Sequence, residues 1–140
     1  MIVVLDTNVI ISALLSPSGP PAEIIDHWEA DDFDVVTSPP LLSELKRALQ
    51  YPRVKKYLKR SPDEVATFTT RFRRMAILVE PQFTLEAIEE DPADNRLLEC
   101  AVAGGASYIV SGDDHLLGLK ASEGMIILSP AGFLLLLGLP

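Results

Sequence analysis

The chain has 140 residues, of which 48% are hydrophobic and 23% are charged, so it can bury one sizeable core but is too short for two domains. We therefore expect a single domain over residues 1–140 and exclude a disordered tail. The net charge of −8 excludes a protein that coats nucleic acid by bulk positive charge, and the single cysteine, Cys100, excludes an internal disulfide.

The two ends of the chain carry no membrane or export signal. The N-terminal residues lack the basic segment of a secretory signal, and the apolar run at residues 133–137 is far too short to cross a bilayer. We expect a cytoplasmic protein without a membrane anchor, in which the run at 133–137 belongs to the core or to a dimer surface.

Apolar runs of strand length alternate with helical patterns along the chain. We expect strands at residues 2–5, 35–37, 75–79, 108–110 and 125–128. We expect helices near residues 8–15, 20–31, 40–50, 52–60, 62–74, 94–104, 113–119 and 130–137, and both Ser38-Pro39 and Asp91-Pro92 place a capping residue before a proline. This alternation predicts an α/β fold with right-handed crossovers and a mostly parallel central sheet.

The basic residues are concentrated in one stretch. Ten of the 12 lysines and arginines, but only two of the 20 acidic residues, lie between Lys46 and Arg74, so this stretch carries +8 and the remainder carries −16. A solvated helical face is the plain interpretation of such a run, but the imbalance favours contact with a polyanion. The residues that we expect to contact it are Lys46, Arg47, Arg53, Lys55, Lys56 and Lys59.

Two aspartates follow predicted strands at their carboxyl ends. Asp6 follows the strand at 2–5, and Asp113 follows the strand at 108–110 after Ser111-Gly112. Ligands of open α/β sheets bind at this edge, so two carboxylates would meet there if the strands are neighbours. Adjacent carboxylates repel each other unless a cation lies between them, and Mg²⁺ or Mn²⁺ prefers such oxygen ligands.

Glu44 and Asp94 could join this pair, because each lies near the start of a predicted helix. Four carboxylates around Mg²⁺ or Mn²⁺ suit phosphodiester hydrolysis. Each acid also has a structural interpretation. Asp6, Asp94 and Asp113 could serve merely as helix caps, and Glu44 could be an ordinary exposed helix residue. The histidines His27 and His115 lack metal-ligand spacing, and Cys100 is expected in the core.

These segments together resemble the PIN domain family, and within it the toxins of toxin–antitoxin systems. The resemblance covers residues 1 to about 128 and lies in four ordered segments, 3–9, 38–45, 91–101 and 106–117. It implies a three-layer α/β/α nuclease that binds Mg²⁺ or Mn²⁺ and cuts single-stranded RNA.

The resemblance also assigns site residues. Asp6, Glu44, Asp94 and Asp113 match the family's acidic positions, and Asn8 and Ser111 match supporting positions that would hydrogen-bond the carboxylates. Either Asp91 or Asp94 could face the metal, and the role of Asp114 stays open. In this interpretation three aspartates hold the ion, and Glu44 is a further ligand or a base that orients the attacking water. Homodimerisation and a cognate antitoxin protein are implied as well.

Three alternatives remain. A haloacid-dehalogenase-type phosphatase would also place an aspartate after its first strand, but it requires a second aspartate where this chain has Asn8. A degenerate PIN-like module could bind RNA or a partner without cutting it. A PIN nuclease could also act in RNA maturation rather than as a toxin, because a fold does not fix a biological role.

Overall fold

The structure is a computed structural model that describes residues 1–83, 92–119, 121–122 and 124–138. The strands are β1 (Ile2–Leu5), β2 (Asp34–Thr37), β3 (Ile77–Leu78), β4 (Tyr108–Val110), β5 (Ala121–Ser122) and β6 (Met125–Leu128). The helices are α1 (Thr7–Leu15), α2 (Pro20–Glu29), α3 (Pro39–Ala48), α4 (Pro52–Tyr57), α5 (Pro62–Met75), α6 (Pro92–Gly104), α7 (Asp114–Leu119) and α8 (Pro130–Leu137).

The strands form one sheet in the order β3-β2-β1-β4-β6-β5. The neighbours from β3 to β6 pair in parallel, which confirms the predicted mostly parallel sheet, and β5 pairs antiparallel with β6. The sequence prediction missed β5, because Ala121–Ser122 contains no apolar run of the kind that marked β3. It also made β3 too long, since Met75 still belongs to α5.

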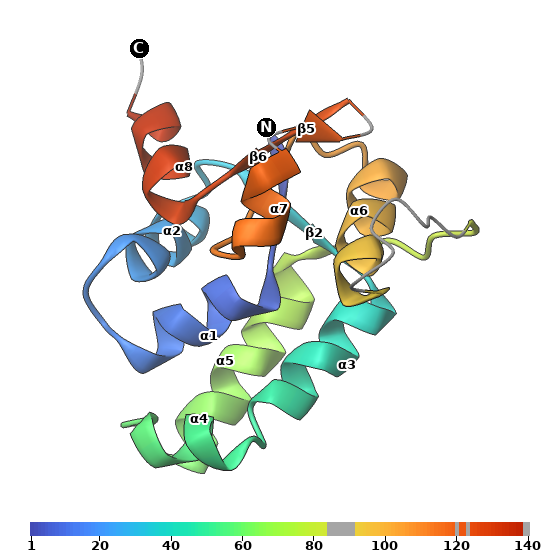
Figure 1. The fold of residues 1–140 in the computed structure, drawn as a ribbon. Helices are drawn as coiled ribbons and strands as arrows, with labels where there is room; N and C mark the ends of the chain where they lie inside the picture. The colour runs from blue at the N-terminus through green and yellow to red at the C-terminus, as the bar shows by residue number, and fades with distance from the viewer. Residues whose placement is uncertain (84–91, 120, 123, 139–140) are drawn as a thin grey trace.

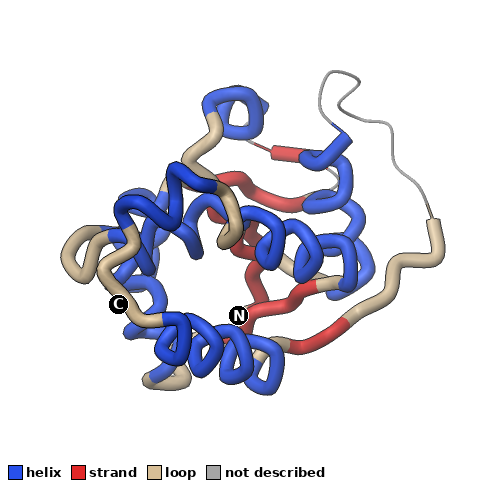
Figure 2. Tube along the Cα trace, turned by 90° about the horizontal axis from the view of Figure 1, so that it is seen from below, coloured by secondary structure: helices blue, strands red, loops and turns tan. Residues whose placement is uncertain are grey.

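The sheet is covered by helices on both faces, which confirms the three-layer α/β/α prediction. Val3 and Leu5 pack in one cluster with apolar residues of α1, α2, α5 and α8, whereas Val4 packs in a second cluster with residues of α6 and α7. Successive strand residues point to opposite faces of a sheet, so both faces of β1 are buried. Figure 2 shows the strands enclosed between helices.

The helix boundaries follow local capping chemistry. Prolines stand at the first turns of α2, α3, α4, α5 and α8, where the missing amide hydrogen costs nothing. Ser61 and Glu64 form a capping box at α5, and Ser129 caps α8 by accepting a hydrogen bond from the main chain of Gly132. Ser38 precedes α3 as predicted, but its side chain makes no capping hydrogen bond.

Three helices end earlier than the sequence suggested. α2 ends at Glu29, α3 at Ala48 and α4 at Tyr57, rather than at residues 31, 50 and 60. At the end of α2, Asp31 has a φ of 65°, a left-handed conformation that cannot continue a helix.

The C-terminal apolar run forms α8, which packs beside α2 and β6 (Figure 1). Phe133 is fully buried against the ring of Phe33, with centroids 5.1 Å apart, whereas Leu135 is 75% exposed. The run therefore belongs mainly to the core, with one side chain on the surface. Within the described part of the chain, no helix has the length and hydropathy that a membrane crossing needs.

Candidate active site

Asp6 is held at the point where β1 ends and α1 begins. Its main-chain N–H donates to the carbonyl of Val110 at 2.9 Å, which continues the pairing of β1 with β4. Its carboxylate is the N-cap of α1 and accepts from the main-chain N–H of Asn8 at 3.4 Å. The side chain is only 5% exposed, so the carboxylate depends on these polar neighbours rather than on bulk water.

Ser111 joins this carboxylate to the neighbouring strand. Its hydroxyl is fully buried, donates to Oδ2 of Asp6 at 2.7 Å and accepts from the main-chain N–H of Asp113 at 3.0 Å. The 2.7 Å length is that of a well-formed O–H···O hydrogen bond. β1 and β4 are therefore neighbours, and three predicted site residues are connected at their shared carboxyl edge.

Asp94 and Glu44 lie on two different helices, each of which starts at this edge of the sheet. Asp94 lies in the first turn of α6 and is 5% exposed. α6 leads back to the start of the parallel strand β4, so its first turn lies at the carboxyl edge of the sheet. The positive end of the α6 dipole favours the Asp94 carboxylate there. Glu44 is half-buried on α3, a helix that packs against both α1 and α6.

The remaining expected residues occupy less central positions. Asn8 is exposed, and its main-chain N–H donates the hydrogen bond to the Asp6 carboxylate. Asp114 is exposed at the start of α7. Asp91 lies outside the described residues, whereas Asp94 is buried, and the choice between the two stays a prediction.

The donors at this edge are suited to a hard cation but do not form a closed cage. Within residues 1–83, 92–119, 121–122 and 124–138, no group of three histidine, cysteine, aspartate or glutamate side chains is arranged to hold a metal ion. Mg²⁺ is usually bound by one or two carboxylates together with water and substrate oxygens. Two buried carboxylates, Asp6 and Asp94, fit that mode of binding.

Comparison with known proteins identifies the family. The PIN domain family matches residues 2–115, which include β1, β4 and all four predicted acids. The chain belongs to the PIN domain family.

Two known proteins are similar to this PIN domain, one in sequence and one in structure. It is 30% identical over 118 residues to the uncharacterized protein MJ1680 of Methanocaldococcus jannaschii, a match that covers 84% of this chain and 74% of the relative. A chain in the crystal structure of VapBC2 from Rickettsia felis, bound to a DNA fragment from its promoter, superposes with a TM-score of 0.60. That match covers 92% of this chain and 98% of the other at 15% identity, so it supports the fold.

Sequence reasoning missed a buried ion pair in this PIN domain. Glu99 on α6 is only 5% exposed and lies 2.6 Å from Nε of Arg96, one turn earlier. Both line a hollow of about 340 Å³ beside the first residues of α3. The signal was available, because a glutamate between Leu98 and Cys100 interrupts an apolar stretch and has a basic partner three residues before it.

Cys100 is a core residue of the PIN domain, as expected. It is fully buried, and burial raises the pKa of its thiol to about 12, with a hydrogen bond to Ser38 acting in the opposite direction. The thiol therefore stays protonated at neutral pH and is not a nucleophile.

Six cations that the sequence suggested for polyanion contact are exposed on α3, α4 and the residues after α4. Arg47 lies three residues beyond Glu44 on α3, so the two side chains are neighbours on the helix surface. Lys46 and Lys55 instead line a groove of about 980 Å³ between α3, α4 and α5.

Proposed function

We propose that this PIN domain is a Mg²⁺- or Mn²⁺-dependent ribonuclease that hydrolyses phosphodiester bonds of single-stranded RNA. The observation that carries the proposal is the buried hydrogen bond from Ser111 to Asp6, which orients a carboxylate where two parallel strands of a PIN fold end. Burial of a carboxylate is offset when it is both hydrogen-bonded and paired with a cation, and Asp94 and Asp113 would add donors of the same kind.

Asp6 and Asp94 would hold the metal ion, with Asp113 as a third ligand, directly or through water. The bound ion would supply a water of lowered pKa and stabilise charge on the leaving oxygen. Ser111 keeps Oδ2 of Asp6 in position, and the main chain of Asn8 does the same for Oδ1. Glu44 serves as a further ligand or as the base that orients the attacking water. Asp114 is a further acid beside Asp113, and Asp91 stays a candidate from the sequence alone.

Exposed cations beside Glu44 would bring the RNA backbone to this acidic edge. A chain of net charge −8 repels RNA at long range, so local cations must offset that repulsion. Arg47 is the nearest candidate along α3, and Arg53, Lys56 and Lys59 extend the same basic stretch. The sequence also predicts that Lys46 and Lys55 contact the RNA.

The biological role that we propose is that of the toxin in a toxin–antitoxin pair. The VapBC2 structure from Rickettsia felis supports this role by its fold. In this role the chain would be a cytoplasmic homodimer whose acidic edge is covered by a cognate antitoxin protein. A role in RNA processing would use the same site, and the adjacent reading frame distinguishes the two, since a toxin requires a neighbouring antitoxin gene.

Cleavage of a labelled single-stranded RNA, with Mn²⁺ and with excess EDTA, tests the proposal. Asp6→Asn and Asp113→Asn should each lower the cleavage rate by about a hundredfold or more. The matched control is Asp34→Asn, because Asp34 is exposed at the opposite, amino edge of the sheet and should retain full activity.

Circular dichroism must show that the asparagine variants remain folded. Metal-dependent cleavage that survives in both Asp6→Asn and Asp113→Asn would refute the site assignment. Binding of Mn²⁺ in calorimetry without any cleavage by the unaltered protein would instead favour the non-catalytic alternative.

A further inference from the structure

The groove between α3, α4 and α5 combines an aliphatic floor with a basic rim. It has a volume of about 980 Å³, and its floor includes Leu42, Leu49 and Val65. The cations on its rim are Lys46, Lys55 and Arg73; Arg60 lines both this groove and a second hollow, where its Nε donates to the carbonyl of Leu14. Among the described residues that line it there is neither a carboxylate nor an aromatic ring. This lining is complementary to a ligand that is both anionic and aliphatic.

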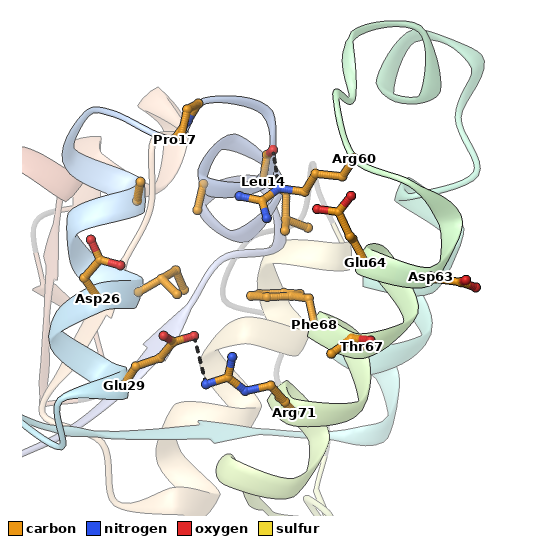
Figure 3. Close-up of a pocket in the computed structure, with 13 residues that line it drawn as sticks. Leu14, Pro17, Asp26, Glu29, Arg60, Asp63, Glu64, Thr67, Phe68 and Arg71 are labelled. Atoms are coloured by element: carbon orange, nitrogen blue, oxygen red, sulfur yellow. Dashed lines mark hydrogen bonds and ion pairs between the residues drawn. The ribbon is translucent and has the colours of Figure 1, made fainter.

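Helix α5 separates the charges of the basic stretch between two faces. Asp63 and Glu64, the only acids between residues 46 and 74, line a different hollow of about 510 Å³ against α1 and α2. Figure 3 shows this second hollow, where Arg71 pairs with Glu29 at 3.5 Å. Other residues of α5, among them Val65, Thr69 and Arg73, line the groove, and neither acid of the stretch is among its lining residues.

The groove faces away from the candidate active site. Leu42, Lys46 and Leu49 recur at the spacing of one helical face of α3 and line the groove. Glu44 is offset from Lys46 by two residues, or about 200° around the helix, and lies beside the buried Leu41. Helix α3 thus stands between the groove and the acids, so a strand of RNA at the acidic edge would not fill the groove.

We propose that this groove binds an acidic, amphipathic segment of a partner protein. A helix with leucine-sized side chains on one face and carboxylates beside them would fill the floor and meet the rim at the same time. RNA fits less well, because single strands bind by stacking bases on aromatic rings, and the described lining residues supply none. The cavity is large enough for several side chains of one segment.

A designed peptide tests this proposal without any nuclease assay, so its result does not depend on the proposed function. The probe is a fluorescein-labelled helical peptide with leucines on one face and glutamates on the other, titrated with the full chain. Lys46→Glu combined with Lys55→Glu should weaken its binding by about tenfold, because two attractive charges become repulsive. Leu78→Ser should weaken it several-fold with no change in charge, since Leu78 lines the groove and is 53% exposed.

The matched control reverses two neighbouring cations outside the groove. Arg47→Glu combined with Lys56→Glu makes the same change in net charge on the same two helices and should leave peptide affinity within about twofold. A peptide in which lysines replace the glutamates should not bind.

Three results would overturn the proposal. The first is no binding of the acidic peptide to the unaltered chain, and the second is an equal loss of affinity in both double variants, which would indicate bulk charge alone. The third is a labelled single-stranded RNA, in EDTA, that displaces the peptide and loses affinity only in the Lys46 and Lys55 variant. That result would assign the groove to RNA.

Discussion

The hydroxyl of Ser111 should contribute measurably to folding, because it satisfies two buried groups. It donates to the Asp6 carboxylate at 2.7 Å and accepts from the main-chain N–H of Asp113 at 3.0 Å. A hydrogen bond to a charged group contributes about 1.5–3 kcal/mol, and loss of the hydroxyl also removes the partner of an amide. We expect the free energy of unfolding to fall by about 2–3 kcal/mol when the hydroxyl is removed.

The variants that isolate this effect are Ser111→Val and Ser111→Thr, which have nearly the same size and differ in the hydroxyl. Urea unfolding followed by circular dichroism compares the two, and thermal unfolding should show Ser111→Val about 10 °C below Ser111→Thr. Equal stabilities would refute the reasoning. If the proposed function holds, Ser111→Val should also lower kcat for RNA while KM stays close to that of Ser111→Thr, as expected of a positioning residue.

Three further predictions concern the packing of α6. Gly104→Ala should destabilise the fold by about 2 kcal/mol, because the new Cβ would lie 2.5 Å from Cγ2 of the buried Val36. In a double-mutant cycle, adding Val36→Ala should recover about 1 kcal/mol of that loss. Glu99→Gln should cost about 2 kcal/mol in chemical denaturation because its ion pair is largely buried, whereas Glu29→Gln, which breaks an exposed pair, should cost less than about 0.5 kcal/mol. The pKa of Cys100 is raised from 9.0 to about 12, so folding favours the protonated thiol, and the resulting stability is present below pH 9 and lost as pH rises toward 12. Subtracting the pH profile of Cys100→Ala isolates this loss, and identical profiles would contradict the burial argument.

The accuracy of the sequence prediction varied with the length of the pattern. Apolar and amphipathic patterns located all eight helices of the described chain and the five parallel strands. The central strands β1 and β4 are the clearest case, because burial on both faces of a sheet leaves a continuous apolar run. Short elements were less predictable. β5 has two residues, and the ends of α2, α3 and α4 depend on single backbone conformations such as the positive φ of Asp31.

For the candidate site, the sequence identified the residue types and the edge of the sheet but not their contacts. Asp6 and Asp113 were expected at carboxyl ends of strands, and the strand order places them on neighbouring strands. The buried pair of Glu99 and Arg96 was missed, because whether a charged helix residue faces solvent depends on what packs against it.

The amino-acid sequence by itself determined the α/β class, the strand ends that carry acids and the concentration of positive charge between residues 46 and 74, since these follow from local pattern and composition. Only the tertiary structure decided that β1 lies beside β4, that Ser111 reaches the Asp6 carboxylate across 105 residues of chain, and that α5 turns the two acids of the basic stretch away from the groove. The physical reason is that strand order and helix orientation are set by the burial of apolar surface contributed by the whole chain, which no local pattern encodes.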